Sequence, residues 1–355
     1  MTSRIYTASV VGGGFGGQLS MTALAASPHF KLTAVADLRE DVRRQLDHSF
    51  PGIRTFTDHE TMFRECPTDV VAVSTFPPTH EEISKAALAL PSLRGILVEK
   101  PLGHTYASGQ RILAAIQERG LPVAVPHGLM ARRTPLEIIE RVRRGDIGTL
   151  KLVEVQCRGW DIINAGIHWL NFFVNLTGLE PVESVLTACD ATARTYRDGM
   201  QVETIAVMTA QTASGVRIVM HMGDDVKVNA EPRLTVFRLI GTQGLIEFYG
   251  WDTDYRIINA EHPAGVVITP EELPVSGHRY HLEHLAEQMD AGTADRTLAT
   301  SSLMALELCE AAYLSSRHRC QVTLPLEDFK VSAPTYWDPG RPYSGADGGR
   351  DGRKL

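Results

Sequence analysis

Short apolar runs and amphipathic segments alternate along the first 125 residues of the chain. The apolar runs lie at 6–11, 31–36, 70–74, 95–98 and 123–125. Segments with helical periodicity lie between several of them, at 18–26, 79–90 and 106–119. Strands that are apolar throughout are typical of parallel sheets that helices cover on both faces. The pattern therefore predicts a doubly wound α/β domain.

The pattern changes after about residue 150. Residues 150–157 alternate between apolar and polar side chains, and further strand-like runs lie at 202–209, 216–222, 234–240 and 245–249. Short turns rather than helices join most of these runs, which predicts a large, mostly antiparallel open sheet with one covered face. Two helical segments, 281–291 and 301–317, follow the strands, so we expect a second domain of α+β class.

Composition and charge narrow the class of protein. The chain has 355 residues, more than one hydrophobic core usually organises, so two domains are expected. A net charge of −7 without a lysine or arginine cluster argues against a nucleic-acid partner. We expect no membrane span, since no apolar run reaches roughly 18 residues, and no secretory signal. The five cysteines form no CxxC pair, which fits a reducing compartment and a cytoplasmic location.

The strongest functional signal is Gly12-x-Gly14-x-x-Gly17, between the first predicted strand and the first predicted helix. Close backbone approach and free N–H groups at a helix N-terminus suit the diphosphate of a dinucleotide. Asp37 ends the second predicted strand, 20 positions after Gly17, where an acid accepts hydrogen bonds from the adenosine ribose. Its charge would repel a 2′-phosphate, so NAD is the expected cofactor. Arg39 is close enough to bind such a phosphate, and NADP stays an alternative.

A second signal is Glu99-Lys100-Pro101, at the carboxyl end of a buried strand. Ligands of open α/β sheets bind just outside these strand ends. A lysine there is costly to desolvate unless it contacts a ligand or a carboxylate. Lys100 therefore either belongs to the active site or pairs with Glu99 in an ordinary loop.

A third signal is a polar stripe on an otherwise apolar helix in the second half of the chain. Asn164, His168 and Asn171 follow one another at spacings of four and three, so they share one helix face. Buried polar groups need partners, so this stripe either lines a ligand cavity or is satisfied internally. A histidine, with a reference pKa of about 6.5, suits proton transfer near neutrality.

Weaker features leave their alternatives open. An H-x-x-H-x-x-H run spans 278–284, but no acid or cysteine completes a zinc site, so we expect no metal. Arg132 and Arg133 follow the last strand of the first domain and either reach an anionic or hydroxylated substrate or open a solvated helix. His127, near the same strand end, is either a substrate contact or a structural residue.

Taken in order along residues 1 to about 325, these motifs resemble the glucose–fructose oxidoreductase, inositol dehydrogenase and rhizopine-catabolism (Gfo/Idh/MocA) family. The matching motifs are the Gly12 to Gly17 loop, Thr75 with Pro77 and His80, Glu99-Lys100-Pro101, Gly145-x-x-Gly148, Asn164-Ala-Gly-Ile-His168 and Gly241-Thr-x-Gly244. The resemblance implies a Rossmann domain over 1–126 and a substrate-binding and oligomerisation domain over 127–331. One face of the second sheet would carry the substrate site, and the other would make a homodimer or homotetramer. An extended, partly disordered tail at 332–355 would follow.

The resemblance also implies an activity and residue roles. Family members typically oxidise or reduce a carbinol of a sugar, cyclitol or related metabolite. The cofactor would lie beside Phe15, Thr75, His80 and Glu99 as well as the glycine loop. Lys100 would contact both the substrate and the nicotinamide ribose, and its peptide bond to proline would be cis.

The chain departs from the family at one position. The family motif D-x-x-x-H maps onto Asn164 to His168, with asparagine in place of aspartate. We expect Asp161, one turn earlier, to substitute in part. His168 is then the first candidate for the base, Lys100 would stabilise charge on the reacting oxygen, and Asn164 would orient the substrate; the roles of His168 and Lys100 could be exchanged.

Two other functions stay open. Some members of the family hold NAD tightly and cleave glycosides through transient oxidation. The chain could also be a non-catalytic sensor that binds a dinucleotide and a partner protein. Retention of Lys100 and His168 argues against the sensor, whereas loss of the motif aspartate favours it.

Overall fold

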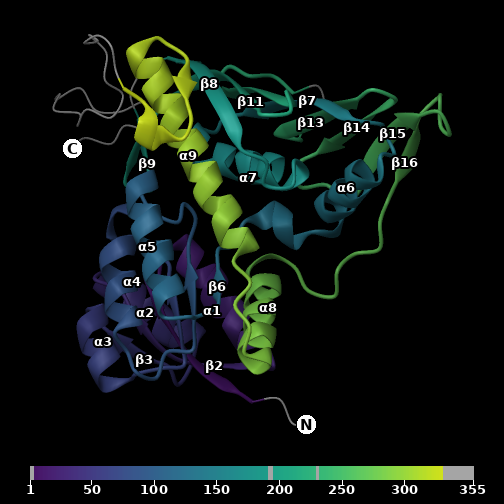
Figure 1. Ribbon diagram of the computed structural model, residues 1–355. Helices are drawn as coiled ribbons and strands as arrows, with labels where there is room; N and C mark the ends of the chain where they lie inside the picture. The colour runs from purple at the N-terminus through teal and green to yellow at the C-terminus, as the bar shows by residue number, and fades with distance from the viewer. Residues whose placement is uncertain (1–3, 191–194, 229–231, 331–355) are drawn as a thin grey trace. The chain divides into compact units, whose positions relative to one another are not determined.

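A computed structural model describes residues 4–190, 195–228 and 232–330, which form two compact units (Figure 1). The first unit comprises 4–131 together with 274–303, and the second comprises 132–273 together with 304–330. From the sequence, 274–303 is expected in the second domain. This segment belongs to the first unit because helix α8 (Gly277–Ala291) buries three apolar side chains in the core of that unit: Leu282, Leu285 and Ala286. The predicted tail, 332–355, lies outside the described residues.

The first unit contains a six-stranded parallel sheet in the order β3-β2-β1-β4-β5-β6. The strands are β1 (Tyr6–Val11), β2 (Phe30–Ala36), β3 (Arg54–Phe56), β4 (Val70–Val73), β5 (Gly95–Val98) and β6 (Val123–Ala124). Every residue of β4 and β5 is buried, as expected for strands with helices on both faces. The predicted doubly wound α/β domain is confirmed.

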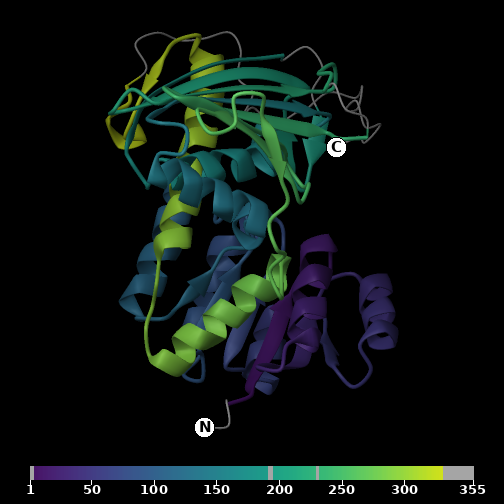
Figure 2. The same ribbon diagram turned by 90° about the vertical axis from the view of Figure 1, so that its right-hand side faces the viewer.

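The helices of this unit follow the strands in alternation. They are α1 (Phe15–Ala26), α2 (Glu40–Ser49), α3 (His59–Glu65), α4 (His80–Leu88), α5 (Tyr106–Glu118) and α8, with short 3₁₀ turns η1 (Pro77–Thr79) and η2 (Gly128–Ala131). Figure 2 shows α8 alongside the sheet, where it packs against α1, β5 and β6. The strand order reverses between β1 and β4, so the loops after these two strands diverge and leave a ligand position at their carboxyl ends.

The second unit contains a nine-stranded sheet in the order β16-β15-β14-β13-β7-β12-β11-β8-β17. These strands are β7 (Leu150–Arg158), β8 (Val182–Cys189), β11 (Ile205–Thr212), β12 (Arg217–Gly223), β13 (Thr235–Gly241), β14 (Gly244–Tyr249), β15 (Tyr255–Asn259), β16 (Val266–Ile268) and β17 (Val322–Thr323). The pairing of β7 with β12 is parallel and the other pairings are antiparallel. The mostly antiparallel open sheet is confirmed.

The predicted strand at 202–209 is in fact interrupted. Strand β10 (Met200–Val202) pairs with β9 (Thr195–Arg197) in a separate hairpin, and β11 begins only at Ile205. The two residues between β10 and β11 are buried, and one of them is Glu203.

Helices cover one face of this sheet. They are α6 (Arg133–Arg144), α7 (Ile167–Leu176) and α9 (Thr297–His318), with a π-helical turn η3 (Ile162–Gly166) before α7 and a 3₁₀ turn η4 (Leu326–Asp328). Both views place α6 and α7 against the sheet (Figures 1 and 2). Aromatic rings fill the space between them, with Phe237 stacked on Phe248 at 4.5 Å and Trp169 edge-on to Phe237 at 5.2 Å. Among the described residues, no helix has the length and apolar character to cross a membrane.

Candidate functional site

The glycine turn after β1 is shaped by backbone that leaves no room for side chains. Gly12 has φ +96°, and a Cβ there would lie 2.6 Å from the Ser74 carbonyl oxygen. A Cβ on Gly17 would lie 1.8 Å from the Gly12 carbonyl oxygen. Gly14, the N-cap of α1, has no described atom within 4 Å of its would-be Cβ. The N-terminus of α1 is therefore open to a ligand, with Phe15 beside it 82% exposed, and this geometry fits a diphosphate.

Asp37 lies at the end of β2 and faces this turn. Its Oδ2 accepts a hydrogen bond from the Gly13 N–H at 2.7 Å, and its Oδ1 accepts one from the Arg39 N–H at 2.8 Å. A carboxylate offers about four lone-pair positions, so two backbone bonds leave acceptors for ribose hydroxyls. The Arg39 side chain approaches the same carboxylate, with Nε 3.5 Å from Oδ1. The predicted arrangement of turn, acid and arginine is thus present in one place.

Replacement of Asp37 by alanine should weaken NAD binding by about 10- to 100-fold. The physical reason is the loss of a hydrogen bond to a charged acceptor, worth about 1.5–3 kcal/mol. NADP should lose less, because the same change removes repulsion of the 2′-phosphate. Calorimetric titration with both cofactors measures the ratio of NAD affinity to NADP affinity. The control is Asp58→Ala, which removes the N-cap acid of α3. An unchanged NAD-to-NADP ratio in Asp37→Ala would contradict this role.

His80 joins the loop after β4 to the loop after β5. Its Nδ1 lies 3.0 Å from the Pro101 carbonyl oxygen and its Nε2 lies 3.0 Å from the Thr75 carbonyl oxygen. The ring is buried, and this burial lowers its pKa. Thr75 also accepts a hydrogen bond on its Oγ1 from the Thr79 hydroxyl. These contacts tie together the two loops that carry Thr75 and Lys100.

Glu99 is buried at the end of β5 and is held by a residue distant in sequence. Its Oε1 lies 2.5 Å from Nε2 of His278 on α8, and its Oε2 accepts a hydrogen bond from the Lys100 N–H at 3.2 Å. Burial alone would raise the pKa of Glu99, but the hydrogen bond and charge of His278 outweigh it and lower the pKa. Glu99 also approaches the glycine turn, since a Cβ on Gly16 would meet its carboxyl carbon at 3.2 Å. The Lys100–Pro101 peptide bond is cis, as the family resemblance implied.

In the second unit, Asp161 holds Asn164 at the start of the π-helical turn η3. Its Oδ1 accepts hydrogen bonds from the Asn164 backbone N–H at 2.8 Å and from Nδ2 at 2.9 Å. Its Oδ2 pairs with Arg197 of the β9–β10 hairpin at 3.1 Å. The Asp161 side chain has no exposed surface, and burial raises its pKa despite these partners. Asp161 is thus bound to Asn164, the position where the family carries aspartate.

Glu203 holds Ile162, the first residue of the same turn. Its Oε1 accepts a hydrogen bond from the Ile162 N–H at 2.7 Å, and its Oε2 accepts one from the Tyr313 hydroxyl at 2.7 Å. Burial, followed by the negative charge of Asp161, raises the pKa of Glu203 to about 7. The turn that carries Asn164 is therefore anchored by two buried carboxylates. Asp161 is expected from the sequence, one turn before Asn164, whereas the helical periodicity could not predict Glu203.

The raised pKa of Glu203 makes the stability of the chain depend on pH. An unfolded glutamate loses its proton near 4.5, whereas folded Glu203 keeps it until about 7. Between these values the folded state binds more protons, so stability falls as pH rises and levels off above 7. Glu203→Gln should flatten this fall and raise Tm at pH 8 by roughly 2–4 °C for each kcal/mol recovered. Thermal unfolding of variant and parent at pH 5 and 8 measures this difference in stability. Equal pH dependence of Tm in the two proteins would contradict the role of Glu203.

His168, in the first turn of α7, is half-buried among aromatic rings. Its ring centroid lies 6.1 Å from that of Trp251, edge-on, and 6.2 Å from that of Trp169. The predicted stripe is not one continuous helix face, because Asn164 lies in the π-helical turn η3 and His168 lies in α7. Asn171 is fully buried and its carbonyl oxygen accepts a hydrogen bond from Asn175 Nδ2 at 2.8 Å. Asn164 and Asn171 thus have protein partners, and His168 retains an accessible surface.

The remaining candidates are structural in their contacts. His127 is fully buried, its Nε2 lies 2.8 Å from the Ser302 hydroxyl, and burial holds its pKa well below the usual range. In the 278–284 run, His278 binds Glu99, and His281 is buried with Nε2 3.1 Å from the His127 carbonyl oxygen. Within the described residues, no three potential ligands gather in a metal-binding arrangement.

A glycine turn of this geometry before α1, with an acid at the end of β2, defines the class of dinucleotide-binding α/β proteins. Residues 7–127 match the model of the Gfo/Idh/MocA oxidoreductase family, described as an NAD-binding Rossmann fold. The uncharacterized oxidoreductase YfiI of Bacillus subtilis (strain 168) is 33% identical over 162 residues, which cover 42% of this chain and 40% of YfiI.

Two further proteins are similar over nearly the whole chain. Trans-1,2-dihydrobenzene-1,2-diol dehydrogenase of Oryctolagus cuniculus is 23% identical over 333 residues, 85% of this chain and 94% of that protein. The crystal structure of aldose-aldose oxidoreductase from Caulobacter crescentus, complexed with glycerol, has a TM-score of 0.75 at 20% identity, and the match covers 90% of this chain and 100% of that one. Residues 7–127 thus form an NAD-binding Rossmann domain of the Gfo/Idh/MocA oxidoreductase type.

Proposed function

We propose that the chain is an NAD-dependent dehydrogenase or reductase that acts on a carbinol or carbonyl carbon of a sugar, cyclitol or related polyol derivative. The observation that carries this proposal is Lys100 at the carboxyl end of β5, whose N–H is bound by the Glu99 carboxylate that lies beside Gly16. The names of the similar proteins, a diol dehydrogenase and an aldose oxidoreductase, support a hydroxylated substrate.

The protein residues would supply position and proton transfer. When bound, the nicotinamide ring accepts or returns the hydride. His168 takes the hydroxyl proton on a ring nitrogen, and Lys100 Nζ donates a hydrogen bond to the reacting oxygen and stabilises its negative charge. Asn164 orients the substrate from a position that Asp161 fixes. His127 has no part in this scheme, because its side chain is buried.

A screen of sugars and inositols for reduction of NAD, followed by nicotinamide absorbance, tests the proposal. Sustained NADH formation with a free sugar or cyclitol supports it. Release of an aglycone from a glycoside without net NADH would support the glycoside-cleaving alternative instead. NAD binding without turnover of any member of either panel would favour the sensor.

We also propose that the face of the nine-stranded sheet that none of the described helices covers joins two copies of the chain. Leu186 and Val207 stand on this face on neighbouring strands, 50% and 46% exposed, where a soluble monomer usually avoids adjacent apolar side chains. The double change Leu186→Glu and Val207→Glu should convert an oligomer into monomers, measured by light scattering after gel filtration. Lys31→Glu, a charge change at an exposed residue of β2 in the first unit, is the control. A parent chain that is monomeric at micromolar concentration would contradict the proposal.

A further inference from the structure

Trp251 is a large aromatic side chain that stands 46% exposed beside the candidate base. Its ring meets the His168 ring edge-on, at 6.1 Å and an interplanar angle of 77°. The buried ring of Trp169 supports it from another side at 5.7 Å. Aromatic side chains left open at a reaction centre are typical of surfaces that a ligand covers.

The loop that carries Trp251 is fixed on both sides. The Thr134 hydroxyl donates a hydrogen bond to the Thr253 carbonyl oxygen at 2.7 Å. Asp252, directly after Trp251, pairs with Arg233 at 2.6 Å. On the other side of Trp251, the Gly250 N–H donates a hydrogen bond to the Thr235 carbonyl oxygen at 3.0 Å. Because both neighbours of the ring are tied to other elements, Trp251 presents a preorganised surface, and a ligand that covers it has little ordering cost.

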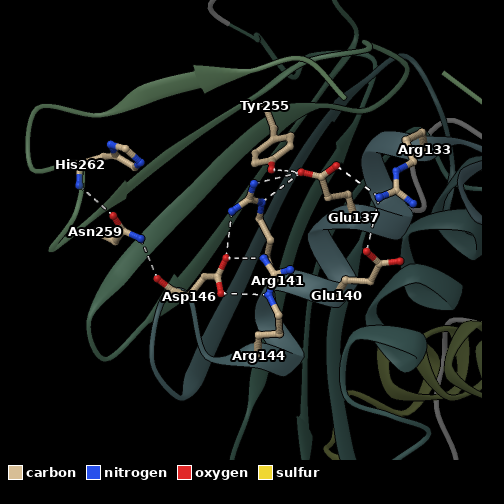
Figure 3. Close-up of polar contacts among 9 residues, drawn as sticks. All are labelled: Arg133, Glu137, Glu140, Arg141, Arg144, Asp146, Tyr255, Asn259 and His262. Atoms are coloured by element: carbon tan, nitrogen blue, oxygen red, sulfur yellow. Dashed lines mark hydrogen bonds and ion pairs between the residues drawn. The ribbon is translucent and has the colours of Figure 1, made fainter. Parts of the chain in front are cut away.

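Arg132 lies over the same ring, with Cζ 5.9 Å from the ring centroid. In the part of the chain that the structure describes, Arg132 has no ion pair with a carboxylate. The next residue differs: Arg133 pairs with Glu137 at 3.6 Å and with Glu140 at 3.5 Å (Figure 3). A guanidinium stacked on an aromatic face keeps its N–H groups available for bidentate binding of an oxyanion.

Figure 3 shows that the carboxylates of Glu137 and Asp146 are bound by other side chains. Glu137 is engaged by Arg133, by Arg141 at 3.1 Å and by the Tyr255 hydroxyl at 2.6 Å. Asp146 is engaged by Arg141 and Arg144, each at 2.9 Å. These carboxylates are therefore neutralised by other partners, and the charge of Arg132 remains available next to Trp251.

We infer that Trp251 and Arg132 form a substrate subsite for a sugar-like molecule that carries an oxyanion substituent. The indole covers an apolar face of the substrate ring, and the Arg132 guanidinium binds a carboxylate or phosphate on the same molecule. The inference rests on the proposed function, because His168 marks the reacting end. The His168 ring and Arg132 Cζ lie 6.1 Å and 5.9 Å from the Trp251 ring, so both groups border the aromatic surface that the substrate would cover.

Calorimetric titration of the full chain with NADH present tests the inference. The probes are three pairs: D-glucuronate with D-glucose, D-galacturonate with D-galactose, and D-glucose 6-phosphate with D-glucose. We expect at least one anionic member to bind about tenfold or more tightly than its neutral counterpart, the effect of one charge-assisted contact. The pair that shows the preference decides between carboxylate and phosphate.

Matched variants assign the preference to this site. Arg132→Gln should abolish it, and Arg132→Lys, which keeps the charge without the planar fork, should retain part of it. Arg133→Gln, an identical charge change one residue away, should leave it unchanged. Trp251→Leu should weaken the binding of both members of a pair to a similar extent. Unfolding curves confirm that each variant is folded.

Several results would overturn the inference: no binding by any probe, equal binding within every pair, or a preference that survives in Arg132→Gln. The outcome separates this inference from the proposed function. Oxidation of neutral sugars without a preference for anionic ones would contradict the subsite and support the dehydrogenase. An Arg132-dependent preference without turnover of any member of the sugar and inositol panel would support the subsite and contradict the dehydrogenase.

Discussion

Lys100→Ala should lower kcat by about 10²- to 10⁴-fold, because it removes the group that stabilises charge on the reacting oxygen. Cofactor affinity should change only a few-fold, since Asp37 and the glycine turn remain. The neighbouring contacts of Glu99 to His278 should also persist, so the fold should be retained. Steady-state kinetics with the substrate that the screen identifies, together with NAD titration, measure both effects.

Two controls separate the chemistry of Lys100 from its charge. Lys85→Ala removes a lysine that pairs with Glu81 on the surface of α4, and it should leave kcat unchanged. Lys100→Arg keeps the charge but not the position of the ammonium, and it should recover little activity. Turnover of Lys100→Ala within a few-fold of the parent would show that the proposed mechanism is wrong.

The second large effect is expected at the glycine turn, where two glycines should respond differently. In Gly17→Ala the new Cβ would overlap the Gly12 carbonyl oxygen at 1.8 Å, a contact between two backbone segments that cannot both stay in place. We expect a loss of stability above about 4 kcal/mol or complete loss of the folded first domain, and loss of NAD binding in either case.

Gly14→Ala should leave the fold intact and still weaken NAD binding. Gly14 has φ −69°, which alanine adopts freely, and no described atom lies within 4 Å of the added Cβ. Stability should fall by no more than about 1 kcal/mol, because alanine is a poorer N-cap than glycine, whereas the added methyl group obstructs the diphosphate. Thermal unfolding and cofactor titration of both variants test this contrast. Parental NAD affinity in Gly17→Ala would contradict the placement of the cofactor.

The sequence predicted the features that depend on local pattern. Strands β4 and β5 are apolar in every residue and buried in every residue, so pattern and structure coincide. The glycine turn and Asp37 were predictable because cofactor binding requires those residues at that spacing. Helix α2 and strand β3 were missed, since α2 is mostly charged and β3 has only three residues.

Contacts between distant residues could not be predicted from one sequence. His278 lies in a histidine run of the sequence, but no local pattern indicates that it binds Glu99, 179 positions earlier. The ion pair of Asp161 with Arg197 likewise depends on the β9–β10 hairpin. The spacing of Asn164 and His168 suggests a regular helix. In the structure Asn164 instead lies in a π-helical turn, and two buried carboxylates hold the first residues of this turn.

Titration of the purified chain with NAD tests the central claim most directly. The account predicts saturable binding of one NAD per chain, in the micromolar to millimolar range usual for such cofactors, and weaker binding in Gly14→Ala. A chain that carries no nicotinamide nucleotide after purification, and gives no binding signal with NAD(H) or NADP(H), would contradict it.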